Sequence, residues 1–281
     1  MLNIDLHLHT TASDGSDTPK ELIAKAKEVG LEVISITDHD TIAGSIEALK
    51  LPYSGVKVIT GIEFSCNTRG DGGFDCHILG YGFDPDHPAI LSAIEHGREM
   101  RLFKLGARLK YLKERFGIEF TDEEIDWLHS LNSVARPHLA RLMIKRGLVR
   151  DVADAFDRYL KVGDFPDDRI DAKEAIEAIL ASGGISVYAH PLGGEREPRI
   201  SEDELIRRVL ILKNMGLGGI ECLYSRYSSD EAYMLISLAK EHGLLVSGGS
   251  DYHGENKTVT LGSLSSDGAI YEDGTVTVVS E

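Results

Sequence analysis

The chain has 281 residues, of which 42% are hydrophobic and 27% charged, and its formal net charge is −16. This composition allows a large buried core, while no apolar run approaches the roughly 18–20 residues that a membrane helix needs. The acidity argues against a coat for duplex DNA and against attraction to anionic membranes. Three cysteines without a CxxC pair, and no visible secretory signal, favour a reducing cytoplasm.

The first 85 residues alternate between strand and helix patterns. Short runs of β-branched and other apolar residues predict strands, and apolar residues three and four apart predict helices. The predicted strands are Met1–Leu8, Val33–Thr37, Lys57–Phe64 and Cys76–Phe83, and the predicted helices are Thr18–Val29 and Gly44–Leu49. A βαβα rhythm of this kind is typical of a parallel sheet.

From Pro88 the pattern becomes helical throughout, which predicts a helical subdomain over residues 88–170, inserted into an α/β unit. The predicted helices are Ala89–Phe116, Asp122–Ser130, Pro137–Arg146 and Asp151–Leu160. This segment holds 15 of the 30 Lys and Arg residues and 14 of the 46 Asp and Glu residues, a net charge of +1 against −17 elsewhere. We expect the acidic part to hold cations and the Arg-rich part to hold an anion, although much of the acidity must be solvated surface.

The alternation resumes at Asp171, so residues 1–87 and 171–281 are predicted to form one unit. The predicted helices are Ala172–Ser182, Ser201–Met215 and Ser229–His242, and the predicted strands are Ile185–Ala189, Gly219–Cys222 and Leu244–Gly248. The tail Gly268–Ser280 contains a hairpin-like stretch around Glu272-Asp273-Gly274.

Histidines and carboxylates recur near the ends of the predicted strands. In a strand, residues two apart point the same way, so His7 and His9 present two imidazoles to one side. The set comprises six of the 11 histidines and three carboxylates: His7, His9, Asp14, His39, Glu63, His77, His190, Asp251 and His253. The carboxyl ends of the strands meet at one rim of an α/β barrel, where catalytic groups converge. Neutral imidazole together with carboxylate suits Zn, Mn or Fe better than Ca or Mg alone.

These motifs resemble those of the PHP (polymerase and histidinol phosphatase) family, over essentially the whole chain and in order. They are His7-Leu8-His9-Thr10, Ser13-Asp14-Gly15, Thr37-Asp38-His39-Asp40-Thr41, Gly61-Ile62-Glu63, His77-Ile78-Leu79-Gly80-Tyr81, Ala189-His190-Pro191 and Gly248-Gly249-Ser250-Asp251-Tyr252-His253-Gly254. The resemblance is greatest to the small stand-alone phosphoesterases of this amidohydrolase-related family, which carry Arg-Pro-His in a helical insert, here Arg136-Pro137-His138. It implies a distorted seven-stranded (β/α) barrel with two or three divalent metal ions, Mn, Zn or Fe.

The resemblance also implies how the ligands are shared. One ion would be held by His7, His9, Glu63 and Asp251, a second by Glu63, His77 and His190, and a third by Asp14, His39 and His253. Asp251, His190 and Glu63 are expected to be catalytic. Metal ions lower the pKa of bound water from about 15.7 to about 7, which would provide hydroxide to attack phosphorus without a Ser or Cys nucleophile.

Three further residues are predicted to contact the substrate. Arg136 can grip a phosphate with two parallel hydrogen bonds, and His138 would lie at a helix N-terminus, which favours anions. Arg196, in the Gly-rich loop after His190, is a weaker candidate for a second phosphate or a leaving group.

The function that we expect is hydrolysis of phosphate monoesters of small nucleotides, such as nucleoside 3′,5′-bisphosphates or short 5′-phosphorylated oligonucleotides. A phosphodiesterase that opens a cyclic nucleotide or sugar phosphate is the alternative. A histidinol-phosphate phosphatase and a non-catalytic, polymerase-associated module are disfavoured, the first by the Arg136–His138 insert and the second by the complete ligand set. The expected partners are a small phosphorylated substrate, including short RNA, with no membrane and no duplex DNA.

Overall fold

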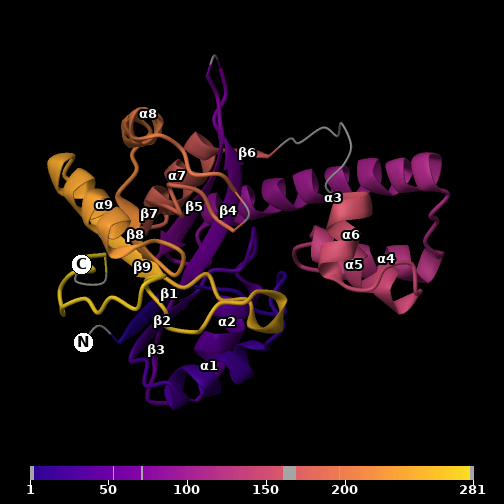
Figure 1. Ribbon diagram of the computed structural model, residues 1–281, viewed down its shortest axis with the longest axis horizontal. Helices are drawn as coiled ribbons and strands as arrows, with labels where there is room; N and C mark the ends of the chain where they lie inside the picture. The colour runs from indigo at the N-terminus through magenta and orange to yellow at the C-terminus, as the bar shows by residue number, and fades with distance from the viewer. Residues whose placement is uncertain (1–2, 53, 71, 161–168, 196, 279–281) are drawn as a thin grey trace.

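The computed structural model describes residues 3–278, apart from 53, 71, 161–168 and 196. Figure 1 shows a barrel-like body with helices packed around it and a smaller helical lobe beside it. The strands are β1 (Ile4–Leu8), β2 (Val33–Ile36), β3 (Lys57–Ile59), β4 (Gly61–Asn67), β5 (Asp75–Tyr81), β6 (Ile170–Asp171), β7 (Ile185–Tyr188), β8 (Gly219–Tyr224) and β9 (Leu245–Gly249). The helices of the body are α1 (Pro19–Glu28), α2 (Ala43–Lys50), α7 (Ala172–Ala181), α8 (Glu202–Asn214) and α9 (Ser229–Glu241).

Seven strands close into a ring, which confirms the predicted (β/α) barrel. The strands form two sheets, in the orders β1-β2-β3 and β6-β4-β5-β7-β8-β9. Isolated bridges join the sheets at both seams, Leu8 to Tyr252 beside β9, and His39 to Glu63 of β4. The ring therefore runs β1-β2-β4-β5-β7-β8-β9, with the short strands β3 and β6 attached to it.

The barrel is distorted because β5 is antiparallel to both of its neighbours, β4 and β7. The prediction of a purely parallel sheet was wrong at this strand. No helix separates β4 from β5, and strands joined by a short connection pair antiparallel, whereas parallel strands need a long crossover. The other described pairings of the ring strands, such as β1 with β2 and β7 with β8, are parallel.

Two other details differ from the sequence prediction. The strand predicted at Lys57–Phe64 is divided at Thr60 into β3 and β4, and the Thr60 hydroxyl donates to the carbonyl of Phe83 at 3.0 Å. In the tail, the expected turn is present, because the N–H of Thr275 donates to the carbonyl of Glu272 at 3.1 Å. No strand pairing forms across that turn in the described part of the tail, whose Thr277 N–H donates instead to Val246 of β9.

Local sequence signals set the beginnings of several helices. Thr18 and Glu21 form a reciprocal capping box at the start of α1, followed by Pro19, and Ser228 and Glu231 do the same for α9. Such caps satisfy backbone N–H groups that have no partner within the helix. None of the described helices combines the length and the apolar character needed to cross a membrane.

The helical lobe has a hydrophobic core of its own. Its helices are α3 (Pro88–Phe116), α4 (Asp122–Ser130), α5 (Arg136–Lys145) and α6 (Val152–Ala155), followed by the π-helical turn Phe156–Leu160. Its buried residues include Leu105, Leu112, Leu128, Leu139 and Met143, which form a cluster separate from those of the barrel. Figure 1 shows that the long helix α3 leaves the barrel and carries α4, α5 and α6 beside its far half.

The close packing of β9 on β1 gives a test of the barrel. A Cβ atom at Gly249 would lie 2.3 Å from Cβ of His7, so Gly249→Ala must shift one of the two strands. We expect it to lower the free energy of unfolding by about 1–3 kcal/mol in urea denaturation.

The matched control is Gly106→Ala in the exposed part of α3, where an added Cβ meets no atom within 4 Å. Alanine favours a helix over glycine, so this change should raise the free energy of unfolding by about 0.5–1 kcal/mol. Equal effects of the two substitutions would contradict the packing described at the β1–β9 seam.

Candidate metal centre

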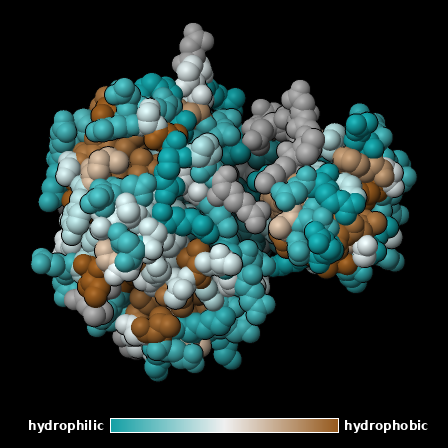
Figure 2. Space-filling view, in the orientation of Figure 1, coloured by the Kyte–Doolittle hydropathy of each residue, from teal (hydrophilic) through white to brown (hydrophobic). Residues whose placement is uncertain are grey.

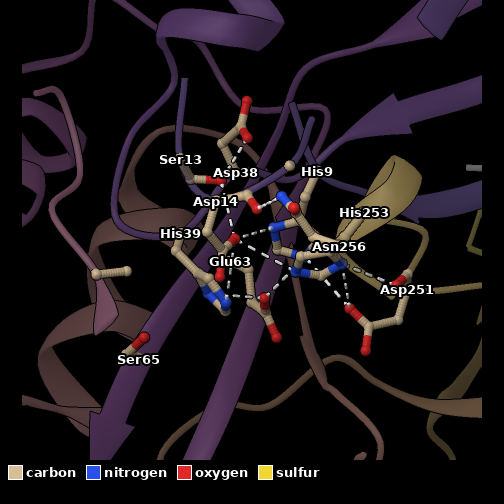
Figure 3. A network of polar contacts seen from close by, with 12 residues as sticks. His9, Ser13, Asp14, Asp38, His39, Glu63, Ser65, Asp251, His253 and Asn256 are labelled. Carbon is tan, nitrogen blue, oxygen red and sulfur yellow. Dashed lines mark hydrogen bonds and ion pairs between the residues drawn. The ribbon is translucent and has the colours of Figure 1, made fainter. Parts of the chain in front are cut away.

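The nine histidines and carboxylates predicted from the strand ends come together at one end of the barrel. Figure 3 shows His9, Asp14, His39, Glu63, Asp251 and His253 of this set. These residues form three groups that could each hold a metal ion, because within each group the ligand atoms all lie within 4.8 Å of one another. The groups are His7, His9 and Glu63; His39, Glu63 and His77; and His9, Asp14, His39 and His253. His190 and Asp251 adjoin them, with His190 Nε2 3.3 Å from Glu63 Oε1 and Asp251 Oδ1 3.4 Å from His9 Nε2.

Glu63 lies at the centre of the cluster. Its Oε1 is 2.8 Å from Nδ1 of His77 and 3.4 Å from Nε2 of His7. Its Oε2 is 3.2 Å from Nε2 of His9 and 2.9 Å from Nδ1 of His39. One carboxylate thus faces imidazoles from β1, from the loop after β2 and from β5, in a position suited to bridging two cations.

Several of these buried atoms have no hydrogen-bond partner. They are His7 Nε2, both ring nitrogens of His9, His39 Nδ1, Glu63 Oε2 and His253 Nε2. A buried polar group without a partner is costly, so a cluster of such groups calls for a partner that the protein itself does not supply. The atoms point toward a shared space without being aligned to bond each other, which is the arrangement that metal ligands require. The residues therefore fit divalent metal ions.

Burial and mutual charge shift the pKa values in the cluster. Burial, together with the neighbouring His253 and His39, lowers the pKa of His9 to about 4, so its imidazole is neutral at pH 7 and can act as a ligand. Burial alone would raise the pKa of Glu63, but His39, His7 and His77 outweigh it and hold the pKa well below its usual range. Asp251 behaves in the same way, with Lys257 as the strongest opposing charge to lower its pKa.

A second layer of residues orients the cluster. Glu221 of β8 is fully buried, and its carboxylate lies 2.8 Å from Nδ1 of His7 and accepts the N–H of His190 at 2.7 Å. The contact with Nδ1 leaves Nε2 of His7 facing Glu63 and fixes the orientation of the ring. Tyr224 and Lys257 bind Oδ2 of Asp251 at 3.0 and 2.7 Å, which turns Oδ1 toward the histidines.

Backbone geometry at the strand ends also supports the site. Asp40, His190 and Asp251 have φ values of 50°, 30° and 59°, in the left-handed region that residues with a Cβ atom rarely adopt. Strain of this kind persists where surrounding contacts hold it, and it is concentrated at functional sites. Here Oδ1 of Asp40 accepts the N–H of Ser65 at 2.8 Å, and Oδ2 pairs with Nε of Arg101 on α3 at 2.5 Å.

The cluster forms the floor of a cavity of about 620 Å³ between the barrel and the helical lobe. The wall contributed mainly by the lobe is cationic and apolar. It includes Arg101, Lys104, Leu105, Arg108, Val134, Arg136, Leu139, Val152, Phe156 and Leu160, and Arg169 and Lys257 add two further cations. Figure 2 shows hydrophilic surface interrupted by hydrophobic patches on the viewed face of both the barrel and the lobe.

The three predicted substrate residues have different positions. Arg136 lines the cavity, and its guanidinium carbon lies 4.9 Å from the centre of the Phe156 ring. His138 is buried and does not line the cavity; its Nδ1 accepts the N–H of Ala135, which caps α5. A substrate contact of His138 stays a prediction. Arg196 lies outside the described residues.

Three residues that contact the cluster were not predicted from the sequence: Glu221, Tyr224 and Lys257. Glu221 left one usable signal, because it is a lone charged residue within the apolar strand Gly219–Tyr224. A buried charge needs a partner, and the partners here are the site histidines. Tyr224 and Lys257 gave no such signal, since neither sits in a recognisable spacing with Asp251.

A β/α barrel with buried imidazoles and carboxylates gathered at one end is typical of metal-binding hydrolases. Comparisons with known proteins identify the family within this class. The sequence model of the family described as PHP domain matches residues 5–182. The chain is 37% identical over 257 residues to the 5′-3′ exoribonuclease of Haemophilus influenzae, with 89% of each chain covered. It is 33% identical over 261 residues to the 3′,5′-nucleoside bisphosphate phosphatase of Chromobacterium violaceum, covering 90% of this chain and 88% of that one.

A solved structure agrees with the sequence comparisons. A protein of Bifidobacterium adolescentis, assigned as a metal-dependent phosphoesterase, superposes with a TM-score of 0.80 and 29% sequence identity, covering 97% of this chain and 93% of that chain. This chain belongs to the PHP domain family.

Substitution of Glu221 tests whether its contact with His7 orients the metal ligands. Glu221→Gln keeps the size of the side chain but removes the charge that orients His7, so we expect about 10- to 100-fold weaker Zn²⁺ binding with the fold retained. Affinity can be measured by competition with a chromophoric chelator.

The control is Glu174→Gln, which alters a histidine–carboxylate pair that neither belongs to the cluster nor lines the cavity, Glu174 Oε1 with His96 Nδ1 at 2.9 Å. That variant should bind Zn²⁺ like the wild type. If Glu221→Gln also binds like the wild type, Glu221 does not orient the site.

Proposed function

We propose that this protein is a metal-dependent phosphoesterase that hydrolyses phosphate monoesters of small nucleotides, such as nucleoside 3′,5′-bisphosphates or short 5′-phosphorylated oligonucleotides. The observation that carries the proposal is the set of buried, unpartnered imidazole and carboxylate atoms at the floor of a cavity with a cationic wall. The floor suits cations and the wall suits anions, which is what hydrolysis of a phosphate ester needs.

The ligand sharing implied by the family resemblance is compatible with the geometry. His7, His9, Glu63 and Asp251 would hold one ion, Glu63, His77 and His190 a second, and Asp14, His39 and His253 a third, with the distances around Glu63 and Asp14 supporting these groups. When bound, divalent ions, which we propose to be Mn, Zn or Fe, would supply Lewis acidity that makes water nucleophilic near neutral pH and offsets charge on the phosphoryl group.

Residues of the chain itself position the groups of the site. Glu63, His190 and Asp251 are the residues that we place nearest the reacting atoms, and the left-handed backbone at His190 and Asp251 fixes where their side chains point. Asp38 holds the loop that carries Asp14 by accepting the N–H of Thr10 at 2.8 Å and the hydroxyl of Ser13 at 2.5 Å. The site therefore needs little rearrangement when the substrate arrives.

The lobe side of the cavity supports a nucleotide substrate. Arg136 offers a planar pair of donors for a phosphate group other than the one being cleaved. Phe156 and Leu139 provide apolar surface on the same wall, suited to a base or sugar. A cationic wall in a chain of net charge −16 also attracts small anions more readily than it does duplex DNA, whose contact area extends onto the acidic surface.

Two further points belong to this proposal. We assign residues 1–87 and 171–281 to the catalytic barrel and 88–170 to a substrate-binding insert, supported by the separate hydrophobic core of the insert.

We also propose a cytoplasmic location, supported by the three buried cysteines, of which Cys66 and Cys76 face each other across β4 and β5 as free thiols.

A substrate panel tests the proposed function. Mn²⁺-reconstituted protein is given adenosine 3′,5′-bisphosphate, AMP, a short 5′-phosphorylated RNA, histidinol phosphate and a five-membered cyclic sugar phosphate, and phosphate release is measured. We expect fastest release from the bisphosphate or the RNA. If only the cyclic ester is hydrolysed, the substrate is a cyclic phosphate and not a nucleotide monoester. If metal-loaded protein releases phosphate from none of the esters, the proposal is contradicted.

Arg136→Ala is expected to act on substrates with two phosphates. It should lower kcat/KM for the bisphosphate about 10- to 100-fold, the size of a lost charge-assisted contact, while sparing 4-nitrophenyl phosphate.

Arg150→Ala is the control, since Arg150 lies in the same lobe with its side chain 85% exposed; it should leave both substrates unaffected. An equal loss on both substrates with Arg136→Ala would mean that Arg136 acts at the chemistry and not at the second phosphate.

A further inference from the structure

The lysine beside the metal centre stands out because no sequence motif predicted it. Nζ of Lys257 lies 2.7 Å from Oδ2 of Asp251, whose other oxygen faces His7 and His9 at 3.6 and 3.4 Å. Lys257 also lines the cavity, so its ammonium group lies at the boundary between the cluster and the space where a substrate enters. We propose that Lys257 is a catalytic residue that contacts the phosphoryl group of the substrate.

The position of Lys257 is fixed by the turn that precedes it. This turn, Gly254–Asn256, is a single 3₁₀ turn whose Asn256 side chain donates to the carbonyl of Asp14 at 2.7 Å. The N–H of Glu255 donates to Ser16 at 2.8 Å. The turn is thus tied to the loop that carries another cluster carboxylate, and Lys257 follows it directly. A lysine held in this way does not need to be ordered by the substrate, so its charge is in place beforehand.

The hydrogen bonds around Asp251 leave donors of Lys257 for the cavity. Oδ2 of Asp251 accepts from both Tyr224 and Lys257, so Lys257 is not needed merely to give that oxygen a partner. An ammonium group has three N–H donors, of which the ion pair uses one. The side chain is only 21% exposed, and an enclosed donor gains most from a charged acceptor. A phosphate dianion above Asp251 and His253 would provide such an acceptor.

The charges around Lys257 favour the same assignment. Asp251, Asp14 and Glu63 supply three carboxylates on the floor of the cavity, which would repel a phosphate wherever their charge is not offset. Lys257 lies against one of these carboxylates on the cavity side. It can therefore offset that repulsion and bind a phosphoryl oxygen, while Arg136 serves a phosphate farther into the lobe. The inference rests on the proposed function, because it places a phosphate ester in this cavity.

Lys257→Ala tests the contact. We expect bound metal to stay as in the wild type by atomic absorption, kcat/KM for the preferred ester to fall about 10²-fold, and the inhibition constant of inorganic phosphate to rise. Propylammonium chloride added to the assay should restore part of the lost rate, because it returns an ammonium group to the space left by the truncation. Lys257→Arg should keep more activity than Lys257→Ala.

The control variant is Lys113→Ala, which removes an exposed lysine that is paired with Glu119 at 2.9 Å in the lobe. It should show no loss and no response to propylammonium.

Two results would overturn the inference. One is unchanged turnover in Lys257→Ala. The other is a loss that follows the loss of metal, with no rescue and no change in phosphate inhibition; Lys257 would then only position Asp251. If the wild type hydrolyses no ester, the proposed function fails, and calorimetry with inorganic phosphate still decides on Lys257: weaker binding by the variant supports the contact, and equal binding removes it.

Discussion

The burial of imidazoles and carboxylates around the carboxylate of Glu63 is the constraint on which the rest of the structure depends. Five histidines from four different strands or strand ends lie within 3.4 Å of its two oxygens, and several of the buried atoms lack a hydrogen-bond partner. Such an arrangement is costly unless cations occupy it. The barrel supplies the rigid frame, and the left-handed backbone at the strand ends directs the side chains. Hydrogen bonds between Glu221 and His7 and between Tyr224 and Asp251 fix the orientation of two of them.

Acidic and basic side chains lie on opposite sides of the cavity. The barrel collects acidic groups at one end, where they suit metal ions, while the inserted lobe faces the same cavity with arginines, lysine and apolar side chains. Arg101 joins the two parts, because it extends from α3 to Asp40 beside the cluster and to the hydroxyl of Ser65 on β4 at 2.9 Å. In the function that we propose, the lobe binds the remainder of the substrate while the barrel holds the ester that is hydrolysed. This arrangement connects the uneven charge of the sequence with the proposed chemistry.

Much of this could be predicted from the sequence. The helix and strand order follows from local periodicity, and the cluster follows from polar residues placed where apolar strands stop, as with His9, His190 and Asp251. Glu63, predicted at the end of a strand, lies instead near the beginning of β4. What depends on distant contacts could not be predicted. The role of Glu221 requires the barrel to bring its side chain from β8 to the imidazole of His7 on β1, 214 residues away in the chain. The break at Thr60 depends on its contact with Phe83, and the position of Lys257 depends on the turn that crosses the Asp14 loop. The reversed direction of β5 was missed although its signal is local, because no helix separates β4 from β5.

Whether this cluster holds metal ions can be measured by anomalous X-ray diffraction from crystals soaked in Mn²⁺. Data collected above the manganese absorption edge locate each ion without any assumption about the reaction. We expect two or three anomalous peaks among the side chains around Glu63, with His7 and His77 on different ions and Asp14 beside a third where three are bound. Mn²⁺ found only at surface carboxylates, with the space around Glu63 holding no peak, would contradict this expectation.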